Sequence, residues 1–156
     1  MYLPLKVLHI AAVVAFLGNI TTGLFWHAVA MRHRDPKLLA FTMGGIIRSD
    51  RWFTISGVVL IIATGVGLAM LARLPILGTG WILWTLVLFS ISGALFMVKV
   101  VPLQRQLLAL AEDGARSGAF DAAGYAALAR RWELWGAGAL ITPLIGLVLM
   151  VLKPAL

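Results

Sequence analysis

His9 is the residue of this chain best placed to do chemistry inside a membrane. It lies in residues 8–18, an apolar run without acidic or basic side chains apart from this histidine. An imidazole surrounded by hydrocarbon has to face a polar partner or a ligand, which makes it a candidate functional residue. His27 follows eighteen residues later, which is five full helical turns at about 100° per residue, so both rings project from one face. At about 1.5 Å per residue they are about 27 Å apart and cannot share one ligand.

An imidazole can ligate haem iron, and the distribution of histidines restricts how. The only other histidine, His33, lies in a polar connection, so the other three apolar stretches have none. A haem at His9 or His27 would therefore need a methionine, a histidine from another subunit, or an open position opposite it. Met70 and Met150 are expected at about the depth of His9, although a methionine in a membrane helix usually only fills space.

Lys99 is the one charged residue inside a long apolar stretch, residues 78–101. It is expected to reach the inner membrane interface, where its flexible side chain extends to the headgroups. We interpret it as a boundary residue. The alternative is a site at the same level that holds the carboxylates of a tetrapyrrole or a lipid headgroup, made by Lys99, His27, Arg130, Arg131 and Glu133.

Other polar residues restrict the functions that the protein can have. Asn19 is expected near the middle of the first span, where an interhelical hydrogen bond is its expected role. Asp50 is placed at the rim of a span, and all the other acidic residues also lie between the apolar stretches or at their rims. With no carboxylate expected inside a span, the sequence argues against a proton-coupled transporter or a divalent-metal pore. The absence of cysteine excludes disulfides, thiolate metal sites and covalently attached c-type haem.

Four apolar stretches position these residues. Each has about 20 residues, which at about 1.5 Å per residue cover a bilayer core about 30 Å thick. A water-exposed fold with 62% hydrophobic and 12% charged residues would expose large apolar patches. The sequence therefore predicts an all-α protein, a four-transmembrane-helix bundle in a single integral membrane domain, residues 1–156. The spans are predicted at about 2–31, 52–72, 79–103 and 132–152.

The connections contain further helical patterns. The pattern in residues 38–47 predicts a short interfacial helix lying in the headgroup region of the first cytoplasmic connection, begun by Asp35 and Pro36. The third span is expected to continue to Ala111 and to break over residues 112–118. Asp121 is expected to cap a helix that runs into the fourth span.

Basic residues are distributed unevenly between the connections. Nine lie in the first and third connections, and Arg73 alone lies in the second. The positive-inside rule then places both termini outside and the two basic connections in the cytoplasm. The net charge of +7 lies at the ends of the spans, so we attribute it to anionic headgroups rather than to nucleic acid. The expected partners are the lipid bilayer and either a second copy of the chain or another membrane subunit.

One dipeptide occurs twice. Arg51-Trp52 and Arg131-Trp132 each open a returning span, eighty residues apart. A duplicated helical hairpin would explain the repeat. We favour the simpler interpretation, that each pair is an ordinary interface anchor.

The first helix resembles that of a known bacterial group. Leu8-His9 followed by Phe16 and Gly18 resembles small four-helix membrane proteins related to the copper-resistance protein CopD and the protoporphyrinogen oxidase HemJ. Over nearly its full length, the chain is most similar to a family of predicted integral membrane proteins of unknown function. In the HemJ group a first-helix histidine is associated with b-type haem and tetrapyrrole oxidation, so the resemblance implies that role for His9 alone. The first helix of this chain differs from those relatives at Phe16, where they usually have tryptophan.

Three functions remain open at this point. The first is binding of haem b or another tetrapyrrole in a redox-linked role centred on His9, with the question of enzymatic activity left open. The second is a non-catalytic membrane accessory or scaffold protein, in which His9 and Asn19 only pack helices. The third is passage of a small molecule or metal. All three place the chain in a bacterial inner membrane as a multi-pass protein, N-out and C-out.

Overall fold

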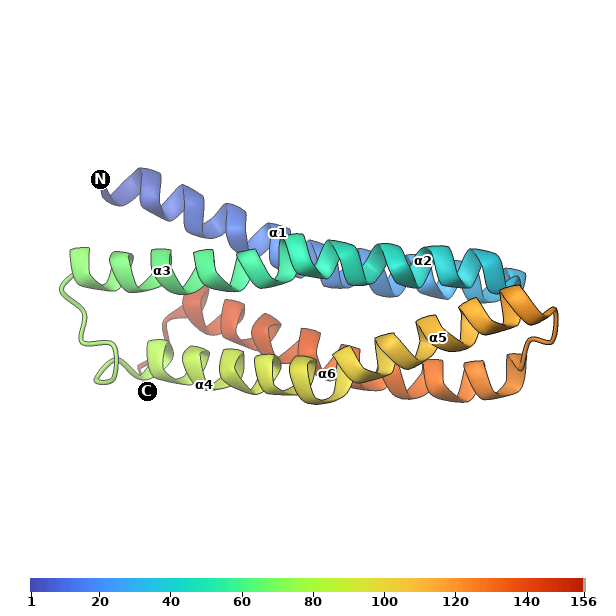
Figure 1. Ribbon diagram of the computed structural model, residues 1–156. Helices are drawn as coiled ribbons and strands as arrows, with labels where there is room; N and C mark the ends of the chain where they lie inside the picture. The colour runs from blue at the N-terminus through green and yellow to red at the C-terminus, as the bar shows by residue number, and fades with distance from the viewer. Residues whose placement is uncertain (156) are drawn as a thin grey trace.

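The computed structural model describes residues 1–155, and these form only helices and their connections. Four rods lie side by side along one direction (Figure 1). Their elements are α1 (Tyr2–His33), α2 (Pro36–Ser49), η1 (Asp50–Thr54), α3 (Ile55–Leu71), α4 (Gly80–Leu95), η2 (Phe96–Val100), α5 (Val101–Ser117) and α6 (Ala122–Leu152). All four rods are long and apolar enough to cross a membrane. The predicted all-α bundle of four membrane-spanning helices is confirmed.

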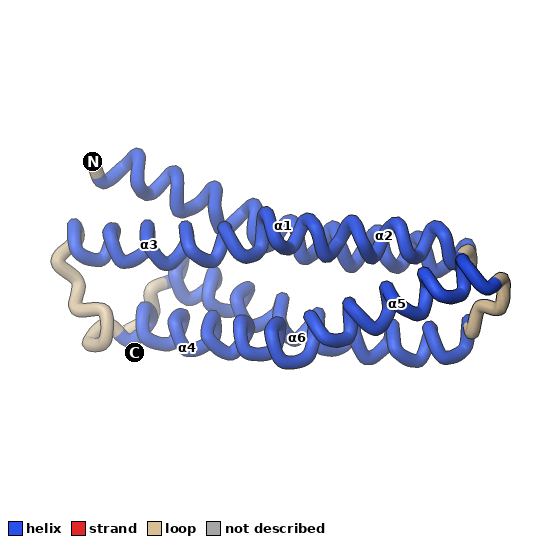
Figure 2. Tube along the Cα trace, in the orientation of Figure 1, coloured by secondary structure: helices blue, strands red, loops and turns tan. Residues whose placement is uncertain are grey.

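The second and third rods are compound helices. In each, two α-helices are joined by five residues of wider π-helix, η1 and η2. The short helix expected in the first connection is α2, but it continues through η1 into α3 in one line (Figure 2). It therefore does not lie as a separate element across the membrane surface. The physical reason is that its apolar face, with Leu39, Met43 and Ile46, is buried against other helices.

Helix ends were predicted in part. Both expected caps are present: Asp35 accepts a hydrogen bond from the Lys37 amide, and Asp121 accepts one from the Gly124 amide, each at 2.9 Å. The break expected over residues 112–118 is wrong, because α5 continues to Ser117. It ends at Gly118, whose φ of 73° is the left-handed conformation that glycine adopts at little cost.

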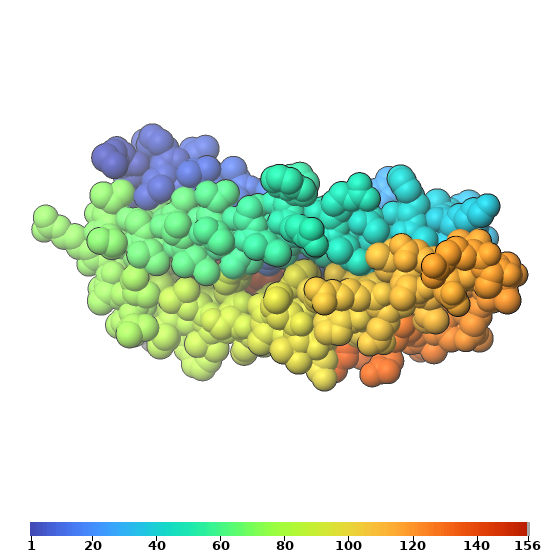
Figure 3. Space-filling model, viewed as in Figure 1, coloured from blue at the N-terminus to red at the C-terminus, as the bar shows by residue number. Residues whose placement is uncertain are grey.

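The rods pair in a definite order. α1 packs against α3, α4 against α6, and α2 against α5. Side chains on α4 bond to carbonyl groups of α6: Ser92 Oγ donates to Ala139 at 2.6 Å, and Thr85 Oγ1 to Gly146 at 3.3 Å. α3 and α4 run antiparallel, but a seam separates them in Figure 3, where deeper atoms of the chain show between the green and yellow helices. The two middle rods therefore contact each other through α2 and α5 rather than through α3 and α4.

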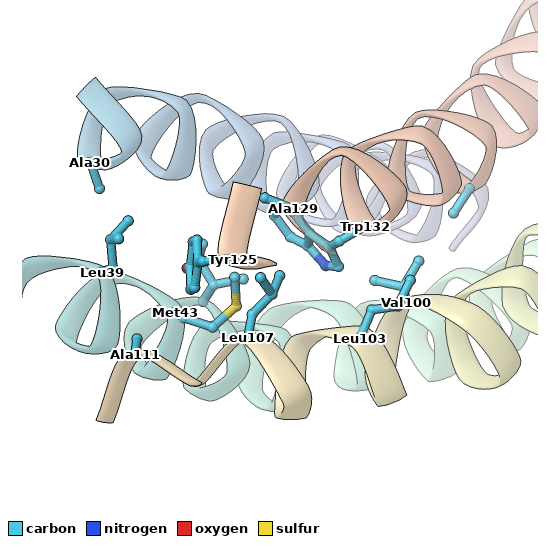
Figure 4. Close-up of a cluster of buried hydrophobic side chains, with 12 residues drawn as sticks. Ala30, Leu39, Met43, Val100, Leu103, Leu107, Ala111, Tyr125, Ala129 and Trp132 are labelled. Atoms are coloured by element: carbon cyan, nitrogen blue, oxygen red, sulfur yellow. The ribbon is translucent and has the colours of Figure 1, made fainter. Parts of the chain in front are cut away.

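The bundle is longer than a bilayer core is thick. The two middle rods have 36 and 38 residues, about 54 and 57 Å at about 1.5 Å per residue, against a core of about 30 Å. α3 and α4 expose large apolar side chains, whereas α2 and α5 bury one apolar face. We call α2, α5 and the adjoining parts of α1 and α6 the polar half, and the remainder the apolar half. The main core lies in the polar half, where Tyr125 and Trp132 point from α6 toward α2 and α5 (Figure 4).

Candidate functional site

Asp50 lies where the two halves of the bundle meet, on the buried side of its rod. It follows Leu39, Met43 and Ile46 at steps of four, three and four residues, so it continues the buried stripe of α2. Only 7% of its surface is exposed. The expectation that Asp50 lies at the rim of a span is therefore wrong, since it is buried within the long helical rod Pro36–Leu71. The spacing of the stripe was the available signal for its burial.

Three neighbouring side chains donate hydrogen bonds to the Asp50 carboxyl group. Asn19 Nδ2 on α1 donates to Oδ1 at 2.8 Å, and Thr54 Oγ1 donates to the same oxygen at 2.9 Å. Gln104 Nε2 on α5 donates to Oδ2 at 2.7 Å. Asn19 also reaches Thr54 Oγ1 at 3.0 Å, so its predicted interhelical hydrogen bonds are present. We call Asp50, Asn19, Thr54 and Gln104 the Asp50 cluster.

No cation pairs with Asp50 among the residues that the structure describes. The ion pair of charged side chains that they contain joins Arg116 to Asp113, and His27 Nδ1 lies 3.5 Å from Glu133 Oε1. The three donors to Asp50 are neutral amide and hydroxyl groups. A buried carboxyl group in this setting has hydrogen-bond partners for its oxygens but no partner for its charge.

A small cavity adjoins the Asp50 cluster. It has a volume of about 20 Å³ and is bordered by all four rods, enough for about one water molecule. Its lining includes Trp132, whose indole Nε1 is buried and has no hydrogen-bond partner among residues 1–155. Both π-helical segments border the cavity, η1 through Asp50 and η2 through Phe96 and Val100. Single turns of π-helix inside α-helices occur frequently at functional sites.

His9 lies half-buried at the interface of α1 and α3. Its Nδ1 is 2.8 Å from Thr64 Oγ1, and Thr64 in turn donates to the Leu60 carbonyl at 2.5 Å. A Cβ atom on Gly65 would lie 3.2 Å from His9 Cε1, so this glycine leaves room for the ring. The hydrogen bond between His9 Nδ1 and Thr64 holds the ring in one orientation.

His27 is fully buried in the polar half. Its Nε2 lies 3.2 Å from the Tyr125 hydroxyl oxygen, and its ring packs edge-on against Trp132 with 4.8 Å between centroids. Its Nδ1 is 3.5 Å from Glu133 Oε1 without hydrogen-bond geometry. The two histidines of α1 therefore both turn inward, His9 toward α3 and His27 toward α6.

The remaining predicted site residues lie apart from these clusters. Lys99 is exposed, with Nζ 5.4 Å above the Trp135 ring, and so does not share the buried surroundings of His27. Met70 is 70% exposed on α3, whereas Met150 is half-buried near the end of α6. Within residues 1–155 no group of three or more His, Cys, Asp or Glu side chains could hold a metal ion. Among these site residues, His9 is the imidazole that could ligate haem iron, and its ring is oriented by the contact with Thr64.

The repeated dipeptide has two different environments. Trp52 is 72% exposed, as expected of an interface anchor, but Trp132 is only 3% exposed. The anchor interpretation is therefore wrong for Trp132. Its ring belongs to the core between His27 and the cavity.

The chain matches a known family of membrane proteins. The model of a family described as predicted integral membrane protein (DUF2269) matches residues 3–154. No curated protein and no solved structure matches the chain.

Proposed function

The chain belongs to the family of predicted integral membrane proteins whose model matches residues 3–154, and we propose that it binds b-type haem or a related tetrapyrrole at His9. The observation that supports it is the setting of the ring, held through Nδ1 by Thr64 at 2.8 Å. Metal-binding histidines usually donate their other ring N–H to an oxygen in this way. The resemblance of the first helix to the HemJ group points to the same residue.

The hydrogen-bond network assigns the tautomer of His9. Thr64 Oγ1 directs its own proton to the Leu60 carbonyl, so the oxygen is an acceptor toward the ring. His9 Nδ1 then carries the proton, and Nε2 keeps the lone pair with which neutral imidazole binds iron. A haem bound there would supply one-electron redox chemistry. The role of Thr64 is to orient the ring and raise the basicity of its free nitrogen.

The first prediction is that His9→Ala abolishes the Soret band of protein produced with ample haem and purified in mild detergent. Thr64→Val should retain haem but bind it about 10- to 100-fold more weakly, the usual effect of losing an outer partner of a ligand. His33→Ala, which changes an exposed histidine of the same helix, is the matched control and should leave the band unchanged. A colourless wild-type protein, or equal loss from His33→Ala, would contradict the proposal.

A second candidate function is supported by the same contacts. His9 joins α1 to α3, and Asn19 joins α1 to η1, each through hydrogen bonds between helices. In a non-catalytic accessory or scaffold protein, these residues serve helix association alone. This alternative predicts a colourless protein whose melting temperature in detergent falls in His9→Ala. The haem proposal predicts that the melting temperature depends on His9 only when haem is present.

The proposed location is a bacterial inner membrane, with the polar half of the bundle in the cytoplasm. The second prediction is that a reporter active only in the cytoplasm is inactive when fused to the carboxyl terminus. The same reporter inserted after Ala119, in the turn between α5 and α6, should be active. The reason is the excess of nine basic residues over one in the connections. Activity at the carboxyl terminus would refute the orientation.

A further inference from the structure

The cavity beside Asp50 is matched to one water molecule. Its volume of about 20 Å³ slightly exceeds the least that a buried water needs, roughly 10–15 Å³. A buried water molecule also needs two to four polar partners. The cavity lining supplies them from three different rods.

Donors and acceptors around the cavity suit water better than a metal cation. Trp132 Nε1–H is a buried donor without a partner, and in Figure 4 this nitrogen lies on the side of the ring that faces α5. The amides of Asn19 and Gln104 use their nitrogens on Asp50, which leaves their oxygens as acceptors. A water molecule can accept from the indole and donate to Asp50 and to one of these oxygens. A bare cation would meet the indole hydrogen unfavourably.

No charged group reaches Asp50 from the elements packed around it. On its own rod Arg48 and Arg51 are exposed, and so are Lys99 on η2 and Arg105 on α5. α1 presents Asn19. On α6, Trp132 lines the cavity and packs against the His27 ring of α1, whose Nδ1 lies 3.5 Å from Glu133 Oε1. A proton that reaches Asp50 through this cavity would neutralise the carboxylate without a nearby cationic side chain.

We propose that Asp50 and one water molecule in this cavity form a proton-binding site at the centre of the bundle. The exchange is a single proton transfer relayed by the water: the water gives a proton to the Asp50 carboxylate as it receives one from the solvent side, which gives a carboxylic acid and leaves a neutral water in the cavity. The reverse step returns the proton to that water. The site uses no residue of the His9 environment, so it stands whether or not haem is bound.

Infrared difference spectroscopy of the purified protein tests the site. We expect a carboxylic acid carbonyl band that rises and falls with pH, shifts in heavy water and is lost in Asp50→Asn. Asp113→Asn, which changes an exposed aspartate in the polar half, is the matched control and should keep the band. A carboxyl band that responds to sodium at constant pH would identify a cation site and overturn the proposal. Absence of the band at every pH would also overturn it.

Two further measurements do not depend on the folding of Asp50→Asn. Carbon-13 labelling of aspartate in the wild-type protein should shift the band, and labelling of glutamate should not. Trp132→Phe removes the indole donor while keeping an aromatic ring, and should change the frequency of the band without removing it. An unchanged frequency would show that the indole and Asp50 do not share a water molecule.

Discussion

His27→Ala is expected to lower the free energy of unfolding by about 3 kcal/mol, because it removes a fully buried ring from a packed core. The ring lies between Tyr125 and Trp132, and a methyl group cannot fill that space. The Tyr125 hydroxyl also loses its contact with His27 Nε2 at 3.2 Å. Denaturant titration in mild detergent, followed by circular dichroism, measures the change.

The matched control for His27 is His33, an exposed histidine at the end of the same helix. His33→Ala should change the unfolding free energy by less than about 0.5 kcal/mol, as surface substitutions usually do. Equal stabilities of the two variants would contradict the packing described for His27.

Gln104→Leu is expected to lower the free energy of unfolding by about 2 kcal/mol, the usual cost of leaving a buried polar group without its partner. Leucine has about the same size as glutamine but cannot donate. Asp50 Oδ2 then loses the hydrogen bond that Gln104 makes at 2.7 Å. Gln106→Leu, on the exposed side of α5, is the control and should change stability by no more than about 0.5 kcal/mol. A loss in Gln106→Leu as large as in Gln104→Leu would refute the assignment.

Local features of the fold were predictable from the sequence. The apolar lengths gave the four spans, and Asp35 and Asp121 gave two helix starts, because these depend only on residues close in the chain. The role of Asn19 in interhelical hydrogen bonding was predictable as well, since an amide inside a bundle needs a polar partner. Which partner it meets was not.

The burial of Asp50 could have been predicted from its position on the stripe of Leu39, Met43 and Ile46. It was missed because the apolar stretch that follows begins two residues later, at Trp52, and so placed Asp50 at a rim. Continuity of α2 and α3 through η1 puts the residue in the middle of a long rod instead. Hydropathy averaged along a chain shows where a membrane begins but not where a helix ends.

The number of spans, the caps and the excess of basic residues in two connections depend on residues close together in the chain, so they could be predicted without the structure. Which side chains meet in the centre depends instead on how the rods pack. Arg51-Trp52 and Arg131-Trp132 are the same dipeptide, yet one indole is exposed and the other is in the core. In α3 and α4 the outward face is as apolar as the inward face, so the periodicity of apolar residues does not show which face is buried. In the amphipathic helices α2 and α5 the periodicity does show it. Burial in the apolar half therefore follows from the packing of one rod on another, as with Thr64 against His9.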